Sequence, residues 1–361
     1  MSIEFIWQLP TSGDGRYGNA EKQRRGERSS SAHPYSPGVT DPRGQSFNYF
    51  DHLHQVARAA DLAGFDGLRI PEDPSGDEPW IVAGYVARGT RHLKLLTEFE
   101  ASRGSSVYAA KNAVSYQRFT GGRFAWQIKA GASEKQRRAQ GDFVADGDRH
   151  ARIEEFLFVA RGVLTQSPYS FKGRFFEVQD GGFQGALGNQ KVPPVYLSGN
   201  SPEDYRLSAK VADVHVFDAA NAATIEREVA LVRDLAKKEG RRLSFGLRLD
   251  VLARETEEEA VFDAERYWQQ PGGRQAGGAS TVDQRLWAGL TKDNTGAAAT
   301  LVGSYEQVEQ ALIAYYAAGI DSFLLSAVPH FEEAFRLGEH VLPFVRSQVS
   351  LEQRRALGGL S

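Results

Sequence analysis

The sequence of 361 residues contains no cysteine. The absence of thiols excludes disulfide bonds, thiol nucleophiles and thiolate ligands to a metal. Histidine occurs eight times, but never in a His-x-x-x-His or His-Glu-x-x-His pattern. His52 and His54 lie two residues apart in an expected helix and do not share a face, which argues against a metal-binding pair. We therefore expect no metal site.

Long apolar runs and a strong net charge are also missing. No segment approaches the roughly 18 apolar residues that a membrane-spanning helix needs. The first residues lack a basic stretch followed by an apolar core, so no secretory signal is expected. A formal net charge of −3 gives no general attraction to nucleic acid or to anionic membranes. The default expectation is a cytoplasmic globular protein.

Short apolar segments alternate with amphipathic helical segments along the whole chain, without internal repeats. This order predicts a (β/α)8 TIM barrel that takes up residues 1–361 as one domain. A doubly wound open sheet is the alternative, and it is disfavoured because no Gly-x-Gly-x-x-Gly pattern follows a strand and opens a helix. The eight expected strands are Ile3–Leu9, Phe65–Ile70, Leu93–Phe99, Arg123–Ile128, Pro194–Leu197, Val214–Phe217, Leu243–Leu252 and Phe323–Leu325.

Three polar segments are predicted as insertions after strands 1, 4 and 7. They are Gly13–Ser46, residues 131–148 and Gln269–Ala299. The first reads as a solvated loop or as a lid, and the third as an irregular, glycine-rich lid segment. A Ser-x-x-Gln capping box begins at Ser304 and predicts a helix that ends at Ala318.

Active sites of such barrels lie at the carboxyl ends of the strands. Polar residues at these ends are therefore the candidates for chemistry. The predicted positions are Ser12, Glu72–Asp77, Glu100, Gln127–Ala132, Ser198–Ser201, Asp218, Arg248–Asp250 and Ala327–Val328.

The segment from Ser198 to Pro202 is a Gly/Ser turn between an expected strand and an expected helix. Such a turn can present backbone N–H groups and hydroxyls to an anion, helped by the helix dipole. The same residues can serve only as a helix N-cap. Both interpretations remain open from the residues alone.

Arg248 and Asp250 alternate along the seventh strand, so their side chains point the same way. Charged groups inside a barrel are seldom buried unless they are paired. One interpretation is a structural salt bridge at the barrel mouth. The other is a pair that faces substrate or cofactor.

Several blocks of residues resemble one family along nearly the whole chain. The sequence is similar to the two-component alkanesulfonate monooxygenases, flavin-dependent enzymes of the bacterial luciferase-like family. The blocks are Leu9–Gly15, Val195–Ser201, Phe245–Val251, Leu286–Gly289, Thr300–Gly303, Gly319–Phe323 and Pro329–Glu339.

The resemblance implies a cofactor and the residues that bind it. FMNH₂ would come from a separate NAD(P)H-dependent flavin reductase, and oxygen would add to the flavin as a peroxide that oxidises the substrate. The segment matching Ser198, Gly199, Asn200 and Ser201 holds the FMN phosphate in the family, and His150 stands where the family has a phosphate-binding tyrosine. Gln127 matches an asparagine near the isoalloxazine ring.

The resemblance also assigns catalytic and substrate positions. Arg248 matches a family arginine important for catalysis, and Asp250 stands where the family has histidine. Four more substrate positions differ from the family: Ser12 replaces histidine, Asp218 tryptophan, Asn294 arginine and Val328 tyrosine. Because carboxylates have replaced much of the cationic cluster, a simple alkanesulfonate is not expected as substrate.

The predicted function is therefore an FMNH₂-dependent monooxygenase that acts on a small neutral polar or cationic molecule. Relatives are commonly dimers or tetramers, which implies a homo-oligomer. Two alternatives stay open. One is a deazaflavin-dependent hydride-transfer enzyme of the same fold, and the other is a flavin-binding protein without turnover. His330 is expected to have a structural role at a helix start.

Overall fold

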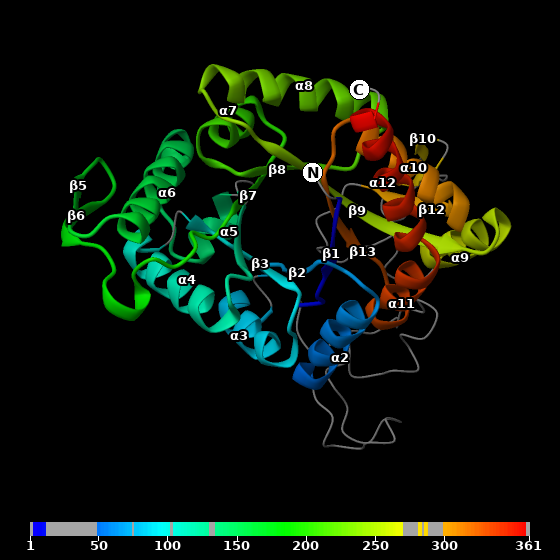
Figure 1. The fold of residues 1–361 in the computed structure, drawn as a ribbon, viewed down its shortest axis with the longest axis horizontal. Coiled ribbons are helices and arrows are strands. Elements are labelled where there is room, and N and C mark those ends of the chain that lie inside the picture. Colours follow the sequence, from blue (N-terminus) through cyan, green and yellow to red (C-terminus); the bar gives the residue numbers. More distant parts are fainter. Residues whose placement is uncertain are drawn as a thin grey trace. The chain divides into compact units, whose positions relative to one another are not determined.

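The computed structural model describes residues 3–11, 49–73, 76–101, 104–129, 134–269, 281–283, 285–287 and 299–358. The fold is the predicted (β/α)8 barrel of the luciferase-like type (Figure 1). Its described residues form two compact units. The first comprises the described parts of Met1–Leu93, Phe217–Val229 and Phe245–Ser361, and the second comprises those of Lys94–Val216 and Ala230–Ser244.

Parallel strands form the centre of the first unit. Strand β1 (Glu4–Gln8) pairs with β2 (Gly67–Ile70) on one side and with β13 (Ser322–Ser326) on the other. β13 in turn pairs with the first half of β9 (Ser244–Arg254). The helices of this unit include α2 (Tyr49–Leu62), α3 (Pro79–Gly89), α9 (Glu257–Gln269), α10 (Tyr305–Ala317), α11 (His330–His340) and α12 (Leu342–Gly358).

The second unit has the same alternating organisation. Its strands β3 (Lys94–Phe99), β4 (Phe124–Lys129), β7 (Val195–Ser198) and the first three residues of β8 (Val214–Asp218) pair in parallel in that order. Phe217 and Asp218 at the end of β8 belong to the first unit. Its helices include α4 (Ser106–Thr120), α5 (Glu134–Ala139), α6 (Arg149–Thr165) and α7 (Pro202–Val211), and α8 (Ala222–Lys238) passes from the first unit into the second. An antiparallel hairpin of β5 (Tyr169–Lys172) and β6 (Glu177–Gly181) follows α6.

Side chains on β1 and β13 alternate between an apolar and a more polar face. On the apolar face, Phe5 stacks on Phe323, and Trp7 packs against Phe65 and the ring of His330 at the start of α11. On the other face, the Ser322 hydroxyl donates to Glu4 Oε2 over 2.9 Å. The apolar side chains therefore face the helices, and the polar ones face the barrel interior.

The predicted eight strands and the helices between them are present, with ends that shift by two residues or fewer. Two expectations for the insertions were wrong. Gln269–Ala299 was expected to be irregular, but it contains the short strands β10 (Thr281–Asp283) and β11 (Leu286–Trp287). β10 pairs antiparallel with β11, and β11 pairs antiparallel with β12 (Thr300–Ser304). β12 in turn runs parallel to the last residues of β9. Strands this short carry too few residues for their alternation to be read from sequence.

Residues 131–148 were expected to be loop-like, but they contain α5. The arginine at the centre of its basic run, Arg137, is only 2% exposed. Its guanidinium donates to the Asp142 carboxylate over 3.4 Å and to the Val144 carbonyl over 3.1 Å, and it forms an ion pair with Asp146. Because the buried Arg137 guanidinium needs these partners, which follow it in the chain, the polar segment takes a defined structure.

Candidate active site

The carboxyl ends of the strands of the first unit collect buried polar side chains. Arg248 lies opposite Leu324 in the pairing of β9 with β13, and Asp250 lies opposite Ser326, the last residue of β13. Asp250 is 1% exposed and Ser326 is 3% exposed. Within the part of the chain that the structure describes, the Ser326 hydroxyl has no hydrogen-bond partner. A buried hydroxyl in that state can still donate to or accept from a ligand.

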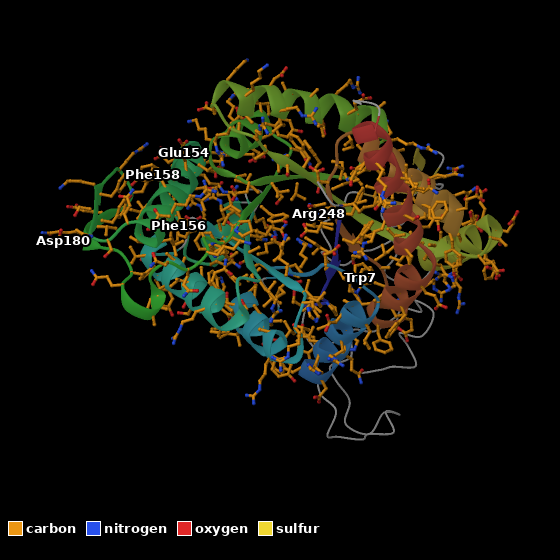
Figure 2. The ribbon with its side chains drawn as sticks, viewed as in Figure 1. Trp7, Glu154, Phe156, Phe158, Asp180 and Arg248 are labelled. Atoms are coloured by element: carbon orange, nitrogen blue, oxygen red, sulfur yellow. The ribbon has the colours of Figure 1, made fainter. Side chains whose placement is uncertain are left out.

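Arg248 is paired with Asp218 at the end of β8. Its Nε donates to Asp218 Oδ1 over 3.0 Å, and its Nη2 donates to the same oxygen. Arg248 is labelled in Figure 2. Its side chain is 14% exposed, and that of Asp218 is 27% exposed. The structure therefore brings together two predicted residues in a partly buried salt bridge, in which Asp218 holds one side of the guanidinium.

Sequence reasoning missed Gln8 and Arg69. Arg69 is 2% exposed on β2, and it donates from Nη1 to the Gln8 side-chain oxygen on β1. The two residues lie opposite each other in the pairing of β1 with β2. The available signal was a lone arginine in the apolar strand Gly-Leu-Arg-Ile, since charged groups are seldom buried in a strand without a specific reason.

In the second unit, Gln127 on β4 is fully buried and lies between Glu98 on β3 and Tyr196 on β7 in the strand pairing. Lys129 Nζ lies 3.9 Å from Glu98 Oε1, and Lys94 Nζ donates to the Tyr196 hydroxyl over 2.9 Å. Gln127 thus belongs to a polar row on neighbouring strands. Such a row can present amide and charged groups to a polar ring system.

The predicted phosphate-binding turn lies between β7 and α7. Ser201 is the N-cap of α7, and its hydroxyl accepts from the Asp204 backbone N–H over 3.1 Å. The Asp204 carboxylate reaches back and accepts from the Ser201 backbone N–H over 3.0 Å and from its hydroxyl over 2.7 Å. This is a complete capping box, so the N-cap interpretation of the turn is observed.

His150 belongs to the same cluster. Its Nε2 lies 2.8 Å from Asp204 Oδ1. Burial by itself would raise the pKa of the Asp204 carboxyl, but the hydrogen bonds from His150 and Ser201 outweigh burial and lower that pKa. The turn therefore already contains an ionised carboxylate.

This arrangement does not fit the FMN phosphate. Gly199 has a φ of +154°, and a Cβ added there would lie 2.4 Å from the Asp204 carboxylate, which packs directly against the turn. The hydroxyl and the N–H of Ser201, together with His150, are the groups that were expected to bind the phosphate. All three interact with Asp204 instead.

Three other predicted residues require comment. Ser12 and Asn294 lie outside the described residues. Val328 packs against a hydrophobic cluster formed by residues of β9, α9, β11 and β12. The cluster consists of Leu252, Ala260, Ala264, Trp287 and Val302. The contacts of Val328 are therefore with α9 and the β11–β12 pair.

His330 is the first residue of α11, and its backbone carbonyl accepts from Trp7 Nε1 over 3.1 Å. Its side chain is 5% exposed. Burial, with a smaller contribution from the nearby His52, lowers the pKa of His330 to about 3. A neutral, buried imidazole at a helix start agrees with the structural role expected for it.

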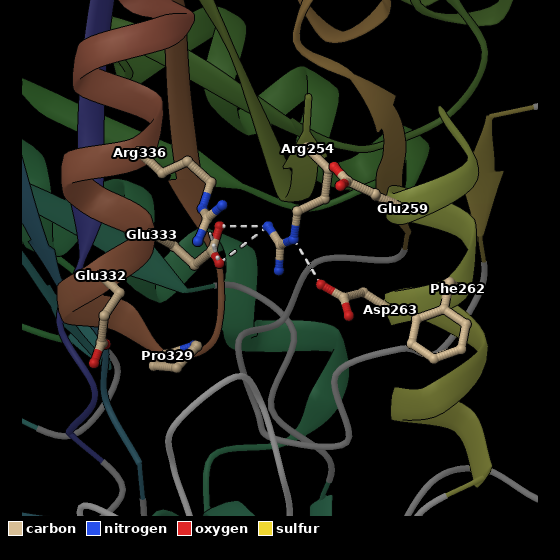
Figure 3. A pocket seen from close by; sticks show the side chains of 8 residues that line it. All are labelled: Arg254, Glu259, Phe262, Asp263, Pro329, Glu332, Glu333 and Arg336. Atoms are coloured by element: carbon tan, nitrogen blue, oxygen red, sulfur yellow. Dashed lines mark hydrogen bonds and ion pairs between the residues drawn. The ribbon is translucent and has the colours of Figure 1, made fainter. Parts of the chain in front are cut away.

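A pocket of about 500 Å³ is lined by residues outside the predicted set. It is formed by the end of β9, by α9 and by the start of α11, and Figure 3 shows Arg254 between Glu333 and Asp263. None of its lining residues was predicted as a site residue. They are Arg254, Glu259, Phe262, Asp263, Pro329, Glu332, Glu333 and Arg336.

These features define an enzyme of the (β/α)8 barrel class with polar groups at the carboxyl ends of its strands. The family described as luciferase-like monooxygenase matches residues 27–322. The chain therefore belongs to the luciferase-like monooxygenase family, and it is an enzyme of the flavin-dependent monooxygenase class.

Similar solved structures include both oxygen-using and hydride-transferring enzymes. EDTA monooxygenase from Chelativorans sp. BNC1 is 16% identical with a TM-score of 0.73, over 96% of this chain and 94% of that one. A long-chain alkane monooxygenase is 16% identical with a TM-score of 0.72, over 96% and 92%. An F420-dependent secondary alcohol dehydrogenase is 17% identical with a TM-score of 0.63, over 82% and 95%. At such low sequence identity, the similarity shows a shared fold only. Among the described residues, no helix combines the length and apolarity needed to span a bilayer.

Proposed function

We propose that the protein is the oxygenase component of a two-component system. It would take a reduced flavin from a separate NAD(P)H-dependent reductase and oxidise a small organic molecule. The observation that carries this proposal is the Arg248–Asp218 salt bridge beside the buried Asp250, at the strand ends of a luciferase-like barrel. When bound, the reduced flavin supplies two electrons to dioxygen, so that one oxygen atom enters the substrate and the other leaves as water.

Each of these three residues would have a distinct role. Asp218 fixes the orientation of the Arg248 guanidinium, whose remaining N–H donors stabilise negative charge that develops during oxygen transfer. Asp250 is buried at the same strand end, where its carboxylate can hold or accept a proton. A preorganised cation and a proton acceptor are the groups that this chemistry requires from the protein.

The same residues limit the charge of the substrate. Asp218 already neutralises much of the charge of Arg248, and Asp250 adds a second carboxylate nearby along β9. A sulfonate would therefore meet net negative charge in a poorly solvated place, which is unfavourable. A neutral polar molecule or an amine- or heterocycle-bearing cation fits better, and a simple alkanesulfonate does not.

The direct test mixes the protein, loaded anaerobically with reduced flavin, with oxygen in a stopped-flow spectrometer. Oxygen consumption coupled to product from an amine or a heterocycle, without turnover of an alkanesulfonate of the same size, is the expected result. Efficient turnover of the alkanesulfonate would refute the proposed substrate class. If the protein-bound reduced flavin does not react with oxygen in the presence of any substrate, the proposed oxygenase function is refuted.

Deazaflavin-dependent hydride transfer is the second candidate, because the F420-dependent alcohol dehydrogenase shares the fold. Such an enzyme would need neither oxygen nor a reductase partner. Anaerobic oxidation of an alcohol with reduction of a deazaflavin would favour it over the oxygenase.

A further inference from the structure

The turn between β7 and α7 carries a negative charge where a cofactor phosphate would need positive or neutral donors. The Asp204 side chain is only 11% exposed, and it accepts from the N–H and the hydroxyl of Ser201 and contacts His150. The N–H groups of a first helical turn normally attract anions. Here the helix supplies its own anion, so that attraction is already satisfied by a residue of the chain.

The two cationic side chains of α7 itself, Arg206 and Lys210, interact with other carboxylates. Glu203, the next acidic residue of the same turn, is ion-paired with Arg206 over 3.0 Å. Lys210, on the same helix, is ion-paired with Glu154 over 3.1 Å. Neither ion pair involves Asp204, whose carboxylate lies directly against Gly199 and accepts from Ser201.

We propose that Asp204 is a specificity residue that excludes the 5′-phosphate and selects a flavin whose ribityl chain ends in an uncharged hydroxyl. A phosphate monoester carries a charge between about −1.5 and −2 at neutral pH, so it would be repelled by a buried carboxylate in contact with its expected donors. A terminal hydroxyl can instead donate to that carboxylate. This inference rests on the proposed use of a flavin, and it replaces FMN by riboflavin as the preferred form.

The test is equilibrium binding of riboflavin and of FMN, in the oxidised and the anaerobically reduced state, followed by flavin fluorescence or absorbance. The wild-type protein is expected to bind riboflavin at least about tenfold more tightly than FMN. Asp204→Asn keeps the size and one acceptor oxygen of the side chain but removes its charge. It is expected to strengthen FMN binding by at least about tenfold and to change riboflavin binding by less than about threefold.

Glu203→Gln is the matched control, because it removes a neighbouring charge from the exposed side of the same helical turn. Its ratio of FMN to riboflavin affinity should stay within about threefold of the wild-type ratio, since exposed charges are screened by solvent. An equal gain in FMN binding in both variants would show a general charge effect and overturn the role of Asp204. The comparison of riboflavin and FMN binding by the wild-type protein tests the inference even if a variant fails to fold.

The outcomes separate this inference from the proposed function. Tighter binding of FMN than of riboflavin by the wild-type protein would overturn the inference and leave the oxygenase standing. Preference for riboflavin without any oxygen-dependent product would support the inference and refute the oxygenase. Binding of neither flavin would overturn both.

Discussion

At the scale of single residues, the geometry of Arg248 leads to a prediction about catalysis. Its Nε and Nη2 both reach one oxygen of Asp218, which a lysine ammonium cannot reproduce with the same orientation. Arg248→Lys should lower kcat by about tenfold to a hundredfold, because a displaced cation stabilises developing charge less well. Steady-state turnover with saturating reduced flavin measures this change.

The control for that substitution is Arg241→Lys. Arg241 also pairs with an aspartate, Asp213, over 3.6 Å, but Asp213 directly precedes β8 and so lies at the amino end of that strand. The control variant should keep its kcat. An Arg248→Lys enzyme with unchanged kcat would contradict the role assigned to this guanidinium.

A second prediction at this scale concerns pH and His330. Its pKa of about 3 in the folded protein lies below the ordinary value of 6.5, so below pH 6.5 the unfolded chain binds more protons than the folded one. Stability should therefore fall as the pH drops from about 6.5 toward 3, by up to roughly 1.4 kcal/mol per pH unit from this group. Urea unfolding at several pH values gives the slope.

His330→Gln should reduce that slope. His340→Gln is its control on the same helix, since the His340 side chain is 43% exposed. The control should leave the slope as in the wild type. Equal slopes in wild type and His330→Gln would show that the acid sensitivity comes from other groups.

At the scale of elements, Arg254 at the end of β9 connects two helices (Figure 3). It donates to Asp263 on α9 over 2.6 Å and contacts Glu333 on α11 over 3.1 Å. Burial would lower the pKa of Arg254, but the two carboxylates outweigh it and raise that pKa. Glu333→Ala should destabilise the protein by about 3–5 kcal/mol, because it leaves Arg254 buried with one partner fewer.

The matched change is Glu332→Ala, which removes the adjacent, exposed carboxylate of the same helical turn. Its effect should stay within about 0.5 kcal/mol. Chemical unfolding measures both variants. Similar losses in the two would mean that the helix start, and not the ion cluster, sets the stability.

Sequence patterns predicted helices, strands and helix caps better than they predicted contacts between distant residues. Ser304 caps α10, and Gln307 completes the capping box, as the local Ser-x-x-Gln pattern indicated. Such a motif can be recognised in the sequence because both partners lie within one helical turn. Asp204 forms an equivalent box, but its contact with His150 joins residues 54 positions apart. No local pattern encodes that contact. The residues alone left the N-cap and the anion-binding interpretations open, and the phosphate assignment came from the family resemblance.

At the scale of the whole molecule, the fold followed from the alternation of apolar strands and amphipathic helices, but the arrangement of the site did not. Arg248 and Asp250 lie on one strand with the same orientation, as their alternation indicated, whereas the pairing of Arg248 with Asp218 spans 30 positions. Gln8 and Arg69 come from different strands, and they become neighbours only through the β1–β2 register. Charge partners across strands depend on the closed barrel, which local periodicity does not specify.

The last prediction concerns the supply of electrons to the whole enzyme. Monooxygenation consumes two electrons for each substrate, and the proposed oxygenase takes them as a reduced flavin. NAD(P)H alone should therefore give no product, whereas photoreduced flavin should restore turnover without any reductase. One oxygen molecule should be consumed for each product formed when reduced flavin is limiting. Product formation from NAD(P)H with the purified chain alone would show that it reduces its own cofactor, and the two-component assignment would then be wrong.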